Sequence, residues 1–277
     1  MAASKWWYAT RQLLGPYVFL IMINDLTTNV PLIKFVDDVT AVEIVNPGAC
    51  SQMQTVLDQI TNWSYANFME INTKKSKQMF FGIASSRNQQ TPLVLGNDTI
   101  DAVPSFKLLG VTISSDLRWD EHIDTICAKA SKRLHYLSLL RRSSVRHAEL
   151  LLYYKTIVRP IIEYACPVWQ SALTEEHRQR LEAIQRRALR IISGSADYDL
   201  QCVVYDIEPV SVRLQNVTRS FFDRINEKHD CLHWLLPSIR SNYIDRLRTF
   251  NKLPLIKCRT QRFKQSFLPY SLANFQF

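Results

Sequence analysis

The segment Leu32-Ile33-Lys34-Phe35-Val36-Asp37-Asp38-Val39-Thr40-Ala41-Val42 decides the fold that the chain predicts. Its β-branched and aromatic residues predict two strands, the first of them buried, joined by a tight turn. Two adjacent carboxylates, Asp37 and Asp38, lie where the chain reverses. Such a pair can hold Mg²⁺, a hard cation that prefers oxygen ligands, although Asp is also common in turns for purely structural reasons.

Three further motifs surround this hairpin in a fixed order along the chain: Leu14-Gly15-Pro16 opening the segment to Leu26, then Met69 to Lys77, then Phe106 to Val111. Together with the Asp hairpin, they resemble the second half of the reverse transcriptase domain of non-LTR (LINE-like) retrotransposons. The resemblance covers roughly residues 12 to 277. It implies an RNA-directed DNA polymerase, which is a nucleotidyltransferase that uses Mg²⁺.

The resemblance implies a role for several residues. Asp37 corresponds to the metal-binding, catalytic Asp of the family's hairpin, and Asp38 to its weaker partner. Lys75 corresponds to a lysine near the triphosphate, with a solvated run of lysines as the alternative. Leu109 and Gly110 correspond to the primer grip, where they would contact nucleic acid, or else form a strand end that packs on a helix.

The chain also departs from the family pattern near its beginning. The family carries its first catalytic Asp well upstream of the Leu-Gly-Pro motif, and residues 1–11 contain no acidic side chain. Thr10 and Arg11 stand where the family has Gln-Gly, a site of close backbone approach. We therefore expect a polymerase domain truncated inside its active site, and no polymerisation by this chain alone. Two alternatives remain: an active enzyme that receives an acid from another chain, or a non-enzymatic nucleic-acid-binding or interaction protein that keeps the basic helical half.

The predicted fold class is α+β, with a partial polymerase palm, made of a small antiparallel sheet with helices, followed by an α-helical thumb-like region. The expected regions are an unmatched segment at 1–11, the partial palm at 12–117, a helical thumb-like region at 118–200 and a helical C-terminal region at 201–277. The expected palm elements are a buried helix at 13–26, a helix to residue 64 opened by a Ser51–Gln54 capping box, a strand at 79–83, a hairpin at 93–100 and a strand at 106–113.

Apolar residues recur at three- and four-residue spacing through the second half of the chain and predict four helices. The first runs from Asp120 to about Arg141, and the second from Leu150 to Val158, ending before Pro160. The third begins at Thr174 as N-cap and ends at Gly194, and the fourth contains Leu214 to Ile225.

Charge is distributed unevenly along the chain. Residues 1–120 hold 9 Lys/Arg and 10 Asp/Glu, a net charge of −1, whereas residues 121–277 hold 25 and 15, a net charge of +10. This asymmetry favours nucleic acid, RNA or DNA, as the partner of the second half. The arginines expected to track phosphate lie on the third helix: Arg178, Arg186, Arg187 and Arg190. The alternative is an ordinary solvated surface beside acidic neighbours.

The remaining signals concern compartment and membrane. The six cysteines are scattered without paired spacing, which favours a reducing compartment, the cytoplasm or the nucleus. His229, Cys231 and His233 lack a fourth ligand at zinc spacing. The apolar run Tyr17 to Ile23 is too short for a membrane span, so no membrane association is expected. No pattern in the sequence predicts an oligomeric state.

Overall fold

The computed structural model describes residues 15–46, 48–82, 92–238 and 253–276. The chain divides into two compact units. We call Met1–Lys107 with Ser114–Leu117 the N-terminal unit, and Leu108–Ile113 with Arg118–Phe277 the helical unit. The expected segment at 1–11, with Thr10 and Arg11, lies outside the described residues.

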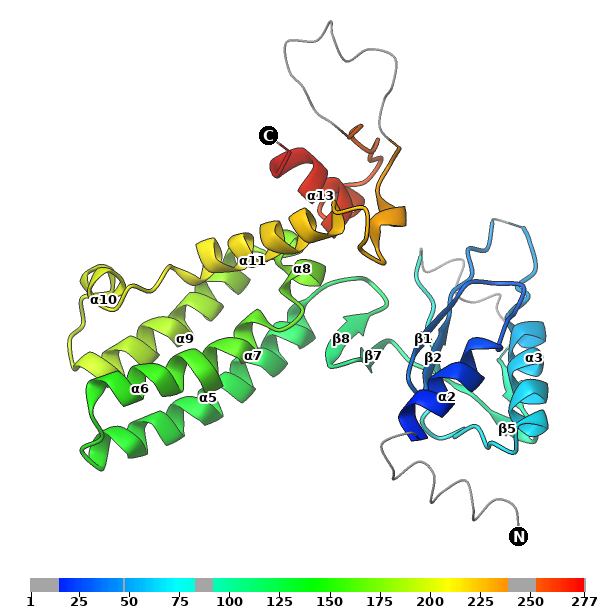
Figure 1. Cartoon of the computed structure of the whole chain (residues 1–277), viewed down its shortest axis with the longest axis horizontal. Helices are drawn as coiled ribbons and strands as arrows, with labels where there is room; N and C mark the ends of the chain where they lie inside the picture. Colours follow the sequence, from blue (N-terminus) through cyan, green and yellow to red (C-terminus); the bar gives the residue numbers. More distant parts are fainter. Residues whose placement is uncertain (1–14, 47, 83–91, 239–252, 277) are drawn as a thin grey trace, which may run out of the picture. The chain divides into compact units, whose positions relative to one another are not determined.

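The N-terminal unit combines two helices with short strand pairs (Figure 1). Its elements are α2 (Gly15–Asn24), β1 (Leu32–Phe35), β2 (Asp38–Ala41), α3 (Met53–Ala66), β3 (Lys77–Gln78), β4 (Val94–Leu95), β5 (Asp98–Thr99) and β6 (Asp101–Ala102). β1 pairs with β2 and β4 with β5 in antiparallel fashion, whereas β3 and β6 are parallel. The expected single sheet is thus a set of separate two-stranded ladders, and the strand expected at 79–83 is replaced by the shorter β3, with Ile83 outside the described residues.

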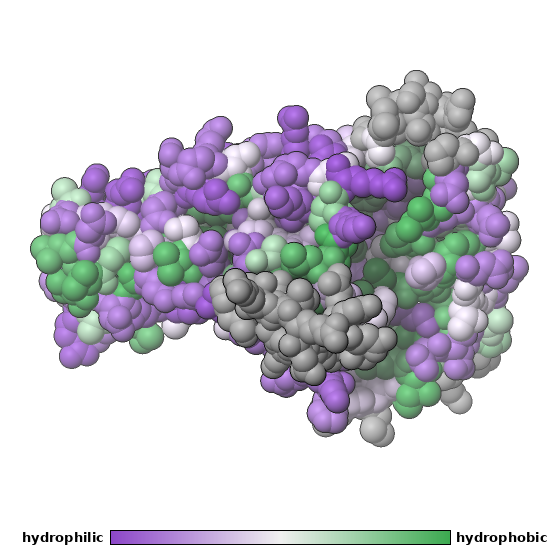
Figure 2. Space-filling model, turned by 90° about the horizontal axis from the view of Figure 1, so that it is seen from above, coloured by the Kyte–Doolittle hydropathy of each residue, from purple (hydrophilic) through white to green (hydrophobic). Residues whose placement is uncertain are grey.

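The core of this unit is small. Leu93, Leu95 and Ile100 are buried against the apolar side of α3, and this confirms the hairpin expected at 93–100. The burial expected for α2 and β1 is wrong: Ile21 is 73% exposed and Ile33 60%. Figure 2 shows hydrophobic side chains, in green, on the face of the molecule that it presents. Two strands and a short helix bury too little area to cover both of their faces.

The expected capping box at the start of α3 is also wrong. The N-cap is Gln52, and the Ser51 hydroxyl accepts a hydrogen bond from the Met53 N–H at 3.2 Å. Gln54 points instead toward β4, where its amide donates to the Val94 carbonyl and accepts from the Val94 N–H, each at 2.9 Å. Gln54 therefore joins helix to strand by the hydrogen bonds that a neighbouring strand would make.

The expected strand at 106–113 is a hairpin, β7 (Ser105–Leu108) and β8 (Val111–Ser114). Leu109 and Gly110 form its two-residue loop and take φ values of +46° and +88°. Positive φ at both loop positions is the geometry of a type I′ turn, whose twist suits a right-twisted hairpin. Gly at the second position makes this turn favourable, and the strand period alone did not reveal it.

The helical unit is built from α5 (Asp120–Arg142), α6 (His147–Tyr153), the π-helical turn η1 (Tyr154–Val158), α7 (Arg159–Glu163), α8 (Cys166–Trp169), the 3₁₀ turn η2 (Gln170–Ala172), α9 (Glu175–Ser193), α10 (Tyr198–Val204), α11 (Val210–Ile225), the 3₁₀ turn η3 (His233–Leu235), α12 (Gln261–Lys264) and α13 (Phe267–Asn274). The helices α5, α7 and α9 run side by side (Figure 1). One apolar core joins them to α6, α8 and the first half of α11, and a second, smaller cluster packs α13 on α11. The expected helices from Asp120 and from Thr174 to Gly194 are confirmed.

The prediction that the second helix ends before Pro160 is wrong. Pro160 stands in the first turn of α7, where its missing N–H is tolerated. The preceding π-helical turn shifts the hydrogen-bond ladder by one residue, so the chain stays helical from His147 to Glu163. The helical course ends at Tyr164 and Ala165, and Ala165 adopts a left-handed conformation with φ +51°.

These elements confirm an α+β fold with small antiparallel ladders and many helices. None of the helices in the described ranges has the length and hydrophobicity that crossing a membrane requires.

Candidate functional site

The Asp hairpin turns through a two-residue loop, Val36 and Asp37. Phe35 pairs with Asp38, which is therefore the first residue of β2. Paired residues share a face of a ladder, so Asp38 lies on the same exposed face as Phe35 and Ile33. Both carboxylates are exposed, and neither forms a hydrogen bond or ion pair with another described residue.

The backbone of this loop is strained. Val36 has a φ of +53°, which is rare for a β-branched residue and usual for glycine at the first position of a type II′ turn. The hairpin is held to α2 by Lys34, whose Nζ donates to the carbonyls of Ile23 at 2.9 Å and Asn24 at 3.1 Å. These carbonyls end α2 and have no partner within the helix. These two hydrogen bonds fix the position of the hairpin relative to α2, and with it the position of the loop that carries Asp37.

The oxygens of Asp37 and Asp38 fit one hard cation that keeps most of its waters. In the described part of the chain, however, no three His, Cys, Asp or Glu side chains gather to hold a metal ion. Lys75 lies in an exposed turn that Asn72 closes, because the Asn72 side chain accepts from the Lys75 N–H at 3.0 Å. No described hydrogen bond or ion pair joins Lys75 to either aspartate, and Lys77 is neutralised by Asp101 at 2.6 Å.

The motif residues Leu109 and Gly110 are held by a tyrosine far along the chain. The Tyr164 hydroxyl donates to the Leu109 carbonyl at 2.7 Å. A Cβ added at Gly110 would lie 3.0 Å from Tyr164 Cε1, so the ring packs directly on the glycine. Gly110 is required twice, by its positive φ and by this close contact. Sequence reasoning missed Tyr164 because nothing local links it to a turn 55 residues earlier.

The strand that follows this turn is attached to α5 by His122. The Thr112 N–H donates to His122 Nδ1 at 3.3 Å, and the ring is buried in edge-on contact with Trp119 and Trp169. Burial, with a smaller contribution from the positive charge of Lys129, lowers the pKa of His122 to about 4. His122 is therefore neutral at pH 7, with its proton on Nε2.

The arginines expected to bind phosphate differ in their surroundings. Arg178 pairs with Glu175 at 3.6 Å, and the guanidinium of Arg186 lies over the Tyr198 ring, 5.2 Å from its centre. Arg187 and Arg190 are exposed and form no ion pair with any described residue.

The charges of α5 and α9 are segregated along the helix axes. The two helices run parallel, because Asp120 pairs with His177 at 2.9 Å and Asp124 pairs with Arg180 one turn further along both. Acidic residues occupy the first turns of both helices. From Lys129 onward in α5 and from Arg186 onward in α9, every Lys, Arg, Asp or Glu is a cation, which is also the arrangement that helix dipoles favour: Lys129, Lys132, Arg133, Arg141, Arg142, Arg186, Arg187 and Arg190. Sequence reasoning missed the three on α5 at 129, 132 and 133, although their spacing places them on one helix face.

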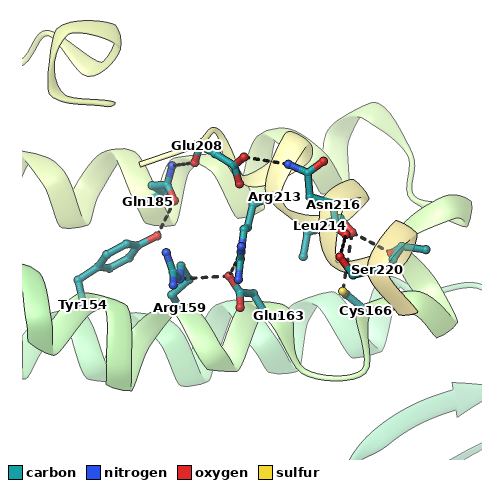
Figure 3. A network of polar contacts seen from close by, with 11 residues as sticks. Tyr154, Arg159, Glu163, Cys166, Gln185, Glu208, Arg213, Leu214, Asn216 and Ser220 are labelled. Carbon is teal, nitrogen blue, oxygen red and sulfur yellow. Dashed lines mark hydrogen bonds and ion pairs between the residues drawn. The ribbon is translucent and has the colours of Figure 1, made fainter. Parts of the chain in front are cut away.

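A second pair of arginines is neutralised inside the unit (Figure 3). Glu163 Oε1 lies 3.1 Å from Arg159 Nε and 2.8 Å from Arg213 Nε. The same two arginines line a cavity of about 260 Å³ together with Asp206 and Glu208. One shared carboxylate and two lining acids leave no excess positive charge there, so this cavity does not suit phosphate.

A buried glutamine positions α9 within the unit. Gln185 accepts from the Tyr154 hydroxyl at 2.6 Å, and its amide donates to Tyr198 Oη at 2.8 Å and to the Glu208 carbonyl at 2.9 Å. Figure 3 shows Gln185 between Tyr154 and Glu208. The Gln185 side-chain oxygen and both N–H groups of its amide thus have partners. This network fixes the rotation of α9 about its axis and hence the outward direction of Arg187 and Arg190.

A comparison with curated proteins identifies two relatives. The chain is 26% identical over 192 residues to the probable RNA-directed DNA polymerase from transposon X-element of Drosophila melanogaster. This alignment covers 65% of this chain and 21% of that protein. It is 22% identical over 245 residues to the corresponding protein from transposon BS of the same species, covering 81% and 27%. The chain thus spans about a quarter of the length of these relatives.

No family model matches the chain, and no solved structure matches it. The two relatives nevertheless confirm the resemblance inferred from the sequence motifs, and they align with most of the chain. The chain is therefore similar to part of the RNA-directed DNA polymerases, or reverse transcriptases, of two transposons.

Proposed function

We propose that this chain binds nucleic acid, RNA or DNA, as part of a transposon-derived reverse transcriptase. In this proposal the N-terminal unit corresponds to part of the palm, and the region from α5 to α9 to a thumb-like element. Leu109 and Gly110 contact the nucleic acid from the turn that Tyr164 holds. The chain works in a reducing compartment, the cytoplasm or the nucleus, which suits its six free thiols.

The observation that carries the proposal is the set of cations from Lys129 onward in α5 and from Arg186 onward in α9, which form no ion pair with any residue that the structure describes. The acidic groups Asp120 and Asp124 are engaged by His177 and Arg180 at the other end of these helices. Basic side chains without internal partners bind phosphate by releasing condensed counterions, which requires no base sequence. An ordinary solvated surface intersperses both signs of charge, whereas here one end of two parallel helices carries one sign.

The test measures binding of a labelled oligonucleotide to the full chain between about 50 and 200 mM salt, where phosphate contacts weaken steeply. The double variant Arg187→Gln with Arg190→Gln removes two free cations, so the slope of log affinity against log salt falls by about 1 for each. Arg146→Gln is the matched control, because Arg146 already pairs with Glu149 and is exposed. A flat salt response of the unmodified chain, or equal slopes for all three proteins, refutes phosphate binding at α9.

We also propose that Asp37 and Asp38 hold Mg²⁺ and that this chain does not extend a primer by itself. When bound, the ion neutralises phosphate charge beside the hairpin. Two-metal catalysis requires ligands for both ions, and the described residues bring no third carboxylate to Asp37 and Asp38. Primer extension with Mg²⁺ or Mn²⁺ is therefore expected at background level. Extension by the unmodified chain that Asp37→Asn abolishes would contradict this and favour an active polymerase.

A further inference from the structure

A groove of about 420 Å³ lies at the second half of α5 in the helical unit, apart from the arginines of α9. Two tyrosines and two leucines make most of its surface apolar and aromatic. Its lining comes from α5 and the residue that caps it, and from the end of α6: Arg133, Tyr136, Leu139, Leu140, Ser143 and Tyr153.

A row of cations leads to this groove. Lys129, Lys132, Arg133 and Tyr136 follow one another at i, i+3, i+4 and i+7, so they lie on one face of α5. All four are exposed, and the three cations form no ion pair with any described residue. The strip of positive charge on this face of α5 therefore leads directly to the aromatic lining of the groove.

The two rings are available to a ligand in different degrees. Tyr136 is 51% exposed. Tyr153 is partly buried, and its hydroxyl donates to the Arg133 carbonyl at 3.4 Å, which orients the ring at the side of the groove. Aromatic faces beside a cationic track are the arrangement that binds single strands, because every base has a π-face and every linkage a phosphate.

We propose that this groove binds a base of single-stranded RNA or DNA, which stacks on Tyr136 while Lys129, Lys132 and Arg133 contact the adjacent phosphates. The inference rests on the proposed nucleic-acid binding and adds a site to it. Charge complementarity selects this occupant, since an apolar peptide of ordinary charge leaves the three cations uncompensated. A duplex keeps its bases stacked inside and cannot offer one to the ring.

The experiment compares two ligands on the full chain at low salt: an oligothymidylate of about 16 nucleotides, and an oligomer of the same length whose linkages carry no bases. Tyr136→Ala is expected to weaken oligothymidylate binding roughly 5- to 150-fold, the usual range for one stacked base. Binding of the abasic oligomer and the salt slope should not change, because no cation is removed. Tyr136→Phe should bind oligothymidylate as the unmodified chain does.

Tyr65→Ala is the matched control, since Tyr65 is a tyrosine of α3 in the N-terminal unit, 73% exposed. It should leave both affinities unchanged. Photocross-linking of an oligomer that carries 5-iodouracil gives an independent measurement, with attachment expected at Tyr136 or Tyr153. Circular dichroism checks that each variant keeps the helix content of the unmodified chain.

The outcomes separate this site from the proposed function. If the unmodified chain binds both oligomers and Tyr136→Ala weakens neither, or weakens both equally, base stacking in the groove is refuted and phosphate binding stands. Cross-links found only at other residues refute it as well. If the unmodified chain binds neither oligomer at low salt, the proposed function fails and this site fails with it.

Discussion

Lowering the pH should destabilise the helical unit through His122. The ring is buried, and burial lowers its pKa from 6.5 to about 4. Between these values the unfolded chain binds a proton that the folded chain does not, so the free energy of unfolding decreases as the pH falls. The contribution is fully present above pH 6.5 and is lost progressively down to about pH 4.

The magnitude follows from the size of the shift. A pKa difference of about 2.5 corresponds to about 3 kcal/mol in total, and about 2 kcal/mol of this is lost between pH 7 and pH 5. This is a large part of the 5–15 kcal/mol that typically stabilises a domain. Protonation at Nδ1 would also remove its hydrogen bond from the Thr112 N–H and place a charge beside Trp119 and Trp169, where Nε2 has no hydrogen-bond partner among the described residues.

The assay is urea unfolding at a series of pH values for the unmodified chain and for His122→Asn, with tryptophan fluorescence as the signal. Asn can accept the Thr112 N–H but does not titrate. The substitution removes ring packing at every pH, so the informative quantity is how the difference in free energy of unfolding between the two proteins changes with pH. The unmodified chain's advantage should shrink by about 2 kcal/mol from pH 7 to pH 5. His135→Asn, at an exposed position of α5, should parallel the unmodified chain. Parallel curves for His122→Asn and the unmodified chain would refute the reasoning.

Three further predictions concern stability. Gly110→Ala should destabilise the chain by about 1–3 kcal/mol in thermal unfolding, because the residue has positive φ and its Cβ would meet Tyr164, and an unchanged melting temperature would contradict both reasons. Gln185→Met keeps volume but leaves the Tyr154 hydroxyl and the Glu208 carbonyl without their partner, so it should cost roughly 2 kcal/mol or more in the same assay, and a neutral effect would show that water replaces the amide. Limited proteolysis should cut the N-terminal unit before the helical unit because its core is much smaller, and the reverse order of cleavage would contradict this.

Local pattern in the sequence determined most of the elements. Three-four spacing predicted α5, α9 and α11, the Thr174 cap and Gly194 bounded α9, and the Asp hairpin followed from its β-branched strands. The ordered motifs also identified the reverse transcriptase relationship. Each single motif or cap lies within a few residues, and each apolar stripe within one helix, where propensity and backbone geometry act without help from distant contacts.

Only the tertiary structure decided which charged and polar groups remain free. Arg180 and Arg187 look alike in the sequence, yet Asp124 neutralises the first, and Arg187 forms no ion pair with a described residue. The turn at Leu109 and Gly110 depends on Tyr164, and the exposure of Ile33 depends on how little of the N-terminal unit covers β1. A residue's partner can lie dozens of positions away, and ion pairing leaves no periodic mark on the chain, so these contacts are decided only when the elements pack together.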